Sequence, residues 1–172
     1  MWSAISTLLG WEVIFAPVEG CFRHGMQTAP LDWGTPHFLR SRREPLTRLL
    51  RDISGATADR RREMVTAAWL RHCGKAAVGI SWGGMTLEAV RAVAGAFPGG
   101  VVATVCGMLL AGGSAWRGGM PDLVMVSQCG TRGRMVEVKS PRDRLSDQQV
   151  AWLRSMERAG ADVAVLKVLA DD

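Results

Sequence analysis

The last third of the chain carries the feature that most restricts its fold. Three short runs rich in β-branched and apolar residues surround one helix-like segment, and the runs are 123–126, 134–139 and 163–168. Runs of this kind, bounded by glycine and polar residues, predict strands. Between the last two runs we expect a helix over 147–159, because Ser146 can cap its start and Gly160 can end it. This order predicts a small α/β core.

The residues before this core favour helices. Apolar side chains recur at helical spacing in five segments, which we expect to be helices: 3–15, 42–53, 58–73, 86–96 and 101–110. The segment 16–36 lacks such periodicity and predicts an ordered loop packed by Phe22, Leu31 and Trp33. The fold class is therefore α/β, with a mixed-sheet core over 113–172 that is preceded by a helical segment over 1–112 packing on it.

Composition and charge exclude several classes of protein. The chain has 172 residues, of which 48% are hydrophobic and 22% charged, as in a globular protein rather than a disordered one. No charge lies between Arg91 and Arg117, but Phe97-Pro98-Gly99-Gly100 interrupts that stretch, so we expect two buried helices and no membrane span. The net charge of +5 allows a polyanionic partner without requiring one.

Cysteine and histidine spacing gives no sign of a metal centre. The four cysteines lie far apart without a CxxC pair, and the three histidines have no ligand spacing. We expect neither a disulfide framework nor a zinc site, and His24, His37 and His72 in surface or loop positions. A reducing, cytoplasmic location fits these cysteines.

Two acidic residues and a lysine lie on the first two predicted strands. Asp122 opens the first, and Glu137 and Lys139 lie two positions apart on the second, so these two share a face. If the strands pair through the turn at 130–133, Asp122 approaches Glu137. Two carboxylates and a carbonyl make an oxygen site suited to Mg²⁺ or Mn²⁺, beside which Lys139 can orient or activate a water against phosphorus. This pattern indicates phosphodiester hydrolysis, but the motif alone equally allows a strand start and a solvated edge.

Longer segments resemble a known nuclease family. The segments GGMPDLV (118–124), VEVKSP (136–141) and DRLSDQQVAWL (143–153) resemble the VRR-NUC nuclease domain. In particular, they resemble the C-terminal region of the Fanconi-associated nucleases, a branch of the PD-(D/E)xK superfamily. The resemblance continues upstream in GWEVIF, in QTAPLD and from Phe38 to Arg43, and so covers nearly the whole chain.

The resemblance implies a restriction-endonuclease-like core, a Mg²⁺ or Mn²⁺ cofactor, and 5′-flap endonuclease and 5′-to-3′ exonuclease activity on branched or flapped DNA in repair. By position it implies that Asp122, Glu137 and the Val138 carbonyl bind the metal and that Lys139 is the catalytic lysine. Gln149 would support the site from the following helix. Gln149 also has a purely structural interpretation, because Ser146 and Gln149 form a capping-box pattern.

Arginines flank this predicted site. The side chains of Arg117, Arg142 and Arg144 can hold DNA phosphates with their guanidinium groups, and a solvated surface is the alternative. The run Arg60-Arg61-Arg62 lies on a predicted helix, where we expect a solvated face rather than a DNA contact.

One family feature falls outside the chain. The family carries another metal-binding glutamate on the helix before the segment matching Trp11, and this chain begins after that point. We therefore expect a fragment, a mis-assigned start, or one piece of a split protein whose missing N-terminal segment is a separate partner. Three functions stay open: the flap nuclease and exonuclease, a catalytically inactive DNA-binding remnant, and a dimeric junction resolvase.

Overall fold

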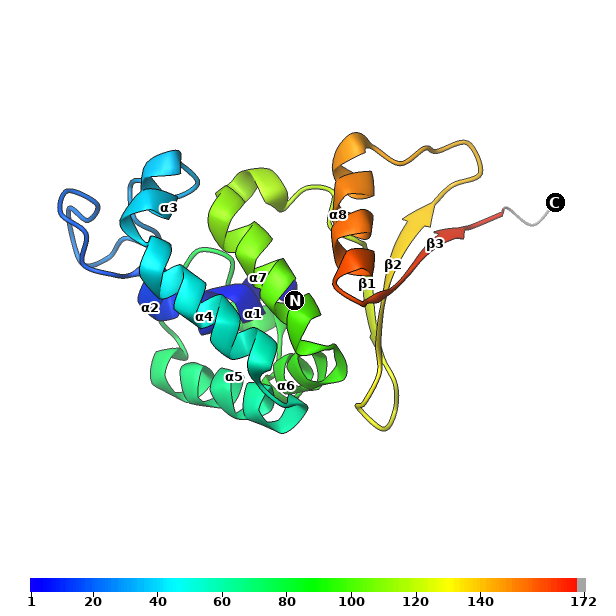
Figure 1. Ribbon diagram of the computed structural model, residues 1–172, viewed down its shortest axis with the longest axis horizontal. Helices are drawn as coiled ribbons and strands as arrows, with labels where there is room; N and C mark the ends of the chain where they lie inside the picture. Colours follow the sequence, from blue (N-terminus) through cyan, green and yellow to red (C-terminus); the bar gives the residue numbers. More distant parts are fainter. Residues whose placement is uncertain (170–172) are drawn as a thin grey trace.

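The computed structural model describes residues 1–169, apart from the side chains of residues 114 and 115. The chain forms a helical body followed by a small sheet (Figure 1). In space, the last helix lies between the two (Figure 1). The body contains α1 (Trp2–Leu9), α2 (Trp11–Ile14), α3 (Pro36–Ser41), α4 (Arg43–Gly55), α5 (Ala58–His72), η1 (Trp82–Gly84), α6 (Leu87–Ala96), α7 (Gly99–Gly112) and η2 (Gly113–Trp116). The remaining elements are β1 (Leu123–Val126), β2 (Gly133–Lys139), α8 (Asp147–Arg158) and β3 (Asp162–Lys167).

The expected helices and strands form, with differences near the N-terminus. The helix predicted over 3–15 is broken at Gly10, where an added Cβ would lie 2.8 Å from the Leu110 side chain, so that glycine allows α1 to cross α7 closely. Thr35 accepts a hydrogen bond from the Phe38 N–H and caps α3, a helix that the sequence did not predict. Leu31 is 52% exposed, so the prediction that it packs the loop 16–36 was wrong.

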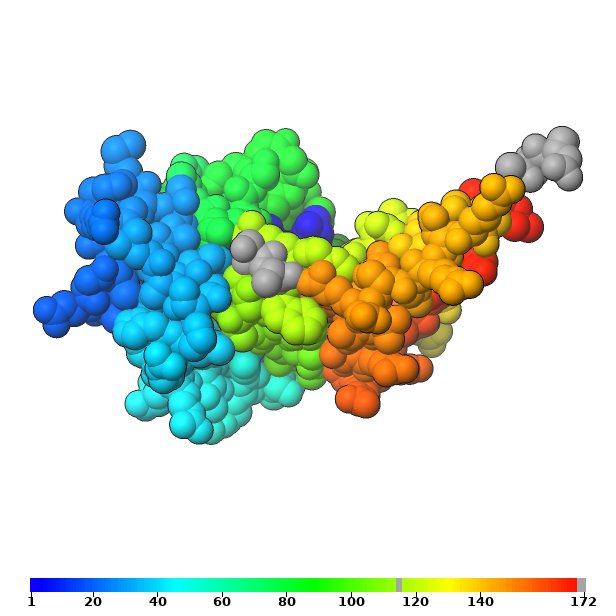
Figure 2. Space-filling view, turned by 90° about the horizontal axis from the view of Figure 1, so that it is seen from above, coloured from blue at the N-terminus to red at the C-terminus, as the bar shows by residue number. Residues whose placement is uncertain are grey.

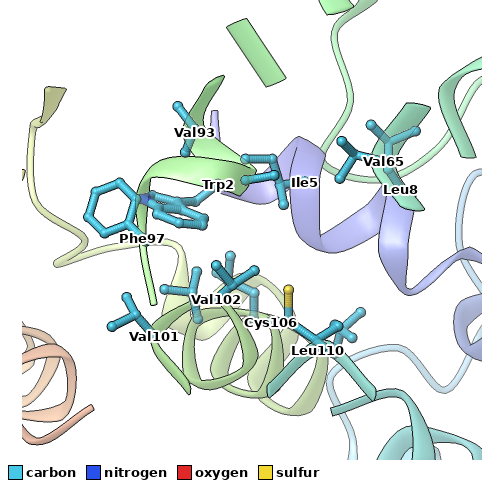
Figure 3. Close-up of a cluster of buried hydrophobic side chains, with 14 of the residues drawn as sticks. Trp2, Ile5, Leu8, Val65, Val93, Phe97, Val101, Val102, Cys106 and Leu110 are labelled. Atoms are coloured by element: carbon cyan, nitrogen blue, oxygen red, sulfur yellow. The ribbon is translucent and has the colours of Figure 1, made fainter. Parts of the chain in front are cut away.

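One hydrophobic core joins the helical body to the sheet. Trp2, from α1, packs edge to face on Phe97 with ring centroids 5.2 Å apart, and neighbouring side chains of α1, α6 and α7 surround them (Figure 3). The same core includes Met135 from β2 and Trp152 from α8. Each such side chain contributes about 1.5–3 kcal/mol when it leaves water. The sheet is therefore fixed against the helices by shared packing.

A buried arginine holds three helices together. Arg61 is 4% exposed, and its guanidinium group donates to the carbonyls of Ala94 (2.9 Å), Phe97 (2.6 Å) and Ala56. Burial, with a smaller effect of neighbouring positive charge, lowers the pKa of Arg61. The expectation of a solvated face was wrong here, because carbonyls at the ends of α4 and α6 need donors and Arg61 supplies them.

The next arginine connects α5 to the sheet. Arg62 donates to the Gly130 carbonyl at 2.9 Å, in the turn between β1 and β2. Of the three consecutive arginines, Arg60 has the solvated position that we expected, with 65% of its side chain exposed. The run thus combines structural contacts with one surface charge.

The sheet is mixed and has the order β1-β2-β3. β1 pairs antiparallel with β2, and β2 pairs parallel with β3. α8 and the helical body cover one face, and Figure 1 shows the other face without a helix among residues 1–169. Exposed apolar side chains lie on that open face, namely Leu123, Met125 and Leu166. In Figure 2 this C-terminal part, orange to red, extends from one end of the helical body.

Every helix of the described residues is shorter than the roughly 20 residues that a bilayer requires. No single helix is both long and apolar enough to span a bilayer, while α6 and α7 pass only as a pair bent by 115°. The two separate helices that the sequence predicts around Pro98 are present.

Candidate active site

The sheet register brings the predicted acidic residues together. The pairing of β1 with β2 begins at Leu123 and Val136, and Asp122 lies in a bend directly before it. Oδ2 of Asp122 accepts from the Val138 N–H, so this side chain reaches β2 between Glu137 and Lys139. Glu137 and Lys139 lie two positions apart on one face of β2 and are joined by an ion pair of 2.8 Å. The three residues therefore lie around one end of the β1–β2 pair.

Pro121, next to Asp122, has no N–H that could bond the carbonyl of Val138 in β2. The Val138 N–H donates to Asp122 Oδ2 at 2.8 Å, which directs this peptide edge of β2 toward β1. The N–H and C=O of one strand residue point to the same side, so the Val138 carbonyl also faces β1. The Val138 carbonyl, the third oxygen that the sequence predicts as a ligand, therefore lies on the strand edge that also contacts Asp122.

Glu137 is the most deeply buried group of this site. Its residue is 1% exposed, and its Oε1 accepts from Lys139 Nζ at 2.8 Å and from Gln149 Nε2. Oε2 is also buried but has no hydrogen-bond partner among the described residues. A buried carboxylate oxygen without a partner is costly, and a cation would satisfy it. The two hydrogen bonds to Oε1 hold the carboxylate in place and leave Oε2 to bind a cation.

Gln149 fills both of the roles that its position allows. Its Oε1 accepts from the Ser146 N–H at 2.9 Å, and the Ser146 hydroxyl accepts from the Gln149 N–H, which completes a capping box at the start of α8. The amide nitrogen of the same side chain is free to donate to Glu137. The cap therefore orients Gln149 for its contact with the buried carboxylate.

The segment before Asp122 is pressed against α8. Gly119 has φ +76°, and an added Cβ there would lie 2.8 Å from Cγ of Gln148. The Trp152 indole N–H donates to the Trp116 carbonyl at 2.9 Å, which anchors the start of the same segment. These positioning residues were not predicted from the sequence. The glycine pair before Pro121 was their only visible signal, because the tryptophan contact joins residues far apart in sequence.

The predicted DNA-binding arginines lie on the connections around this site. Arg117 follows η2, whereas Arg142 and Arg144 lie between β2 and α8, and all three are exposed. The start of α1 is also close, because Met1 and Trp2 line a hollow of about 480 Å³ together with Asp122. This hollow is lined mainly by apolar side chains, and none of the three arginines lines it.

The donor set fits a hard divalent cation. Carboxylate and carbonyl oxygens are the ligands of Mg²⁺ and Mn²⁺ in proteins, and the partnerless oxygen of Glu137 supplies a specific place for one. The metal and DNA-binding roles of these residues stay predictions, because the geometry places the side chains without any ligand.

We expect Gln149→Ala to reduce cation affinity or cleavage about 10–100-fold, as loss of a group that orients a metal ligand commonly does. The matched control is Ser146→Ala. It removes the other half of the capping box and costs about 1 kcal/mol of stability, yet leaves the amide of Gln149 beside Glu137. Equal effects of both variants on cleavage would show that Gln149 acts through the cap alone. Cation titration and DNA cleavage measure the difference.

Comparison with known proteins gives a consistent result. The profile of the VRR-NUC domain matches residues 57–170. The chain is 37% identical to Fanconi-associated nuclease 1 of Homo sapiens over 98% of its own length, and 36% identical to the homolog in Oryza sativa subsp. japonica over 98%. It spans only 17% and 18% of the lengths of those two proteins.

The fold likeness extends over the whole chain. The crystal structure of paFAN1 bound to 5′-flap DNA with a gap matches with a TM-score of 0.85 and 27% identity, covering 100% of this chain and 31% of that one. A second paFAN1 structure, with a longer flap, also has a TM-score of 0.85 at 27% identity and covers 99% of this chain and 31% of that one. These findings confirm the resemblance read from the sequence and the predicted α/β, restriction-endonuclease-like fold. The division at 112/113 stays a prediction.

Proposed function

Since the chain belongs to the VRR-NUC domain family, we propose that it is a divalent-metal-dependent DNA phosphodiesterase of the 5′-flap endonuclease and 5′-to-3′ exonuclease type that acts in DNA repair. The observation that carries the proposal is the arrangement around Glu137. Its buried carboxylate is held through Oε1 by Lys139 and Gln149, while Oε2 has no partner among the residues described. A structural ion pair alone would not need that free oxygen.

Asp122, Glu137 and the Val138 carbonyl hold the cation in this proposal. Mg²⁺ or Mn²⁺ bound there supplies Lewis-acid stabilisation of the negative charge that develops on the phosphoryl and leaving oxygens. Gln149 keeps the Glu137 carboxylate in place. Lys139, 14% exposed at its side chain, directs its amino group to the carboxylate and can orient the attacking water by a hydrogen bond.

Branched DNA with a 5′ end is the substrate we propose. Both paFAN1 structures described above hold 5′-flap DNA, and Arg117, Arg142 and Arg144 are exposed around the site. Guanidinium groups at these positions can bind backbone phosphates through paired hydrogen bonds. Such contacts position a duplex without reading its sequence.

The test is cleavage of a labelled 5′-flap duplex by the purified chain in Mn²⁺ or Mg²⁺. We expect strand cleavage that chelation stops and that Asp122→Ala reduces at least about 100-fold, because a cation ligand and the strand contact to Val138 are both lost. Asp143→Ala is the control, since Asp143 is an exposed carboxylate in the β2–α8 connection. Cleavage that persists in Asp122→Ala would refute the assignment.

A second function has one observation in its favour. Among residues 1–169, no third Asp, Glu, His or Cys side chain joins Asp122 and Glu137 in a group that could hold a metal. A site with two carboxylates is therefore also compatible with a catalytically inactive DNA-binding remnant. Calorimetric titration with Mn²⁺ separates the two functions: the nuclease binds the ion, whereas the remnant binds flap DNA equally with and without it.

A further inference from the structure

A second cluster of possible ligands lies in the helical body, away from the nuclease site. Cys21, Asp32 and His37 each direct one ligand atom to a common place, and the three atoms lie within 4.8 Å of one another. The Leu31 N–H donates to the Cys21 carbonyl at 2.9 Å and closes the loop that carries the first two residues. Thr35 caps α3, where His37 lies on the first turn.

Asp32 is the centre of this cluster. Its side chain is 10% exposed, and Oδ2 accepts from Arg42 Nη1 at 2.8 Å and from His37 Nδ1 at 2.9 Å. Oδ1 is buried and has no partner in hydrogen-bond geometry among the described residues. As at Glu137, one carboxylate oxygen is held by donors and the other is left without a partner. A buried carboxylate oxygen in that state is a place for a cation.

Neighbouring side chains hold the Asp32 carboxylate in place. Burial acts to raise its pKa, but hydrogen bonds from His37 and Arg42, with a smaller effect of the nearby Cys21 thiol, hold the pKa below its usual value. Arg42, fully buried and 4.5 Å from the centre of the Phe38 ring, orients the carboxylate in the way that outer groups commonly orient metal ligands.

We propose that Cys21, Asp32 and His37 form a zinc site that fastens the loop 16–35 to α3. Thiolate, imidazole and carboxylate together are a donor set for Zn²⁺ rather than for Mg²⁺. Ligand atoms around one tetrahedral zinc are about 3–4 Å apart, so small side-chain rotations bring these three into place. A thiolate and a carboxylate neutralise the ion, while Arg42 stays paired with Oδ2 of Asp32. A water completes the four ligands on the side where His37 is 55% exposed.

Spacing along the chain could not reveal this site. Cys21 and His37 belong to no ligand motif, and our sequence analysis expected no zinc and a surface or loop position for His37. The ligand set arises only when the loop folds back on α3. The site is independent of the proposed nuclease function, because it shares no residue with it.

The test of the zinc site uses Co²⁺, which absorbs visible light, in place of Zn²⁺. The full chain, stripped of metal with a chelator, is titrated with Co²⁺ and followed by absorption. We expect one equivalent to give a thiolate-to-cobalt charge-transfer band with the visible bands of a four-coordinate ion, and Zn²⁺ to remove both. Oxygen ligands at Asp122 and Glu137 cannot give the thiolate band, so the two sites are distinguished.

Variants identify the ligands. Cys21→Ser should lose the charge-transfer band, and His37→Ala, a change at an exposed side chain, should weaken Co²⁺ binding at least about tenfold. The double variant Cys73→Ser, Cys129→Ser removes the two exposed cysteines and should keep the band. No band in the wild type, or a band that survives Cys21→Ser and disappears with the exposed cysteines, would overturn the proposal. Asp122→Asn should leave the spectrum unchanged.

Discussion

Replacing Lys139 with methionine is expected to lower the rate of DNA cleavage about 10²–10³-fold, the usual effect of removing one donor that stabilises a charged transition state. Methionine preserves most of the length of the side chain, which is 14% exposed, so the packing of β2 stays intact. Gln149 still donates to Oε1 of Glu137 and keeps that carboxylate oriented. Single-turnover cleavage of flap DNA measures the change.

The same variant separates chemistry from cation binding. Because removing a positive charge next to Glu137 cannot weaken the attraction of that carboxylate for a cation, Mn²⁺ affinity should stay equal or rise. Lys75→Met is the control, since Lys75 is exposed and lies in the connection after α5. A Lys139→Met protein that cleaves at the wild-type rate would limit Lys139 to a structural ion pair.

Arg61→Leu is expected to destabilise the fold by about 3–5 kcal/mol, because each buried carbonyl that loses its donor costs about 1–3 kcal/mol. Leucine fills part of the space but leaves the carbonyls of Ala56, Ala94 and Phe97 without their donors. The energy recovered by no longer burying a charge offsets a part of this loss. Equilibrium unfolding in urea, with intact wild-type protein as reference, measures the difference.

The neighbouring arginine provides the control for this change. Arg60→Leu removes an exposed ion pair with Glu63 one turn along α5, and its effect on stability should stay within about 0.5 kcal/mol. If the two variants unfold at the same urea concentration, Arg61 does not connect the helices as we describe. Flap cleavage by folded Arg61→Leu protein should be close to normal at low temperature, because Arg61 lies outside the nuclease site.

The parts of the fold that were predictable are those whose signals are local. The strand runs, the Ser146 cap and the proline break before α7 depend on neighbours in sequence, and each is present in the structure. The shared face of Glu137 and Lys139 follows from the alternation of side chains along a strand. Pairing of the first two runs through the turn at 130–133 predicted that Asp122 approaches Glu137, and the resemblance to a known family added the roles assigned to these residues.

Other features depend on distant contacts and left no local signal. Arg61 lies in a run of three arginines that is typical of a solvated helix, and its burial becomes favourable through the carbonyls at the ends of α4 and α6. α1 ends at Gly10, where an added Cβ would lie 2.8 Å from the Leu110 side chain of α7. The carboxylate oxygen of Glu137 that lacks a partner could not be foreseen either, since it depends on which oxygen Gln149 reaches across from α8.

The most direct test is an anomalous-diffraction experiment on crystals of the chain grown with Mn²⁺. Our account predicts one strong anomalous peak about 2.1 Å from a carboxylate oxygen of Asp122, from Oε2 of Glu137 and from the Val138 carbonyl. The peak should vanish in crystals of Glu137→Gln. Well-ordered crystals with no manganese at this position, or with the ion bound only elsewhere, would contradict the claim that these three residues form the cation site.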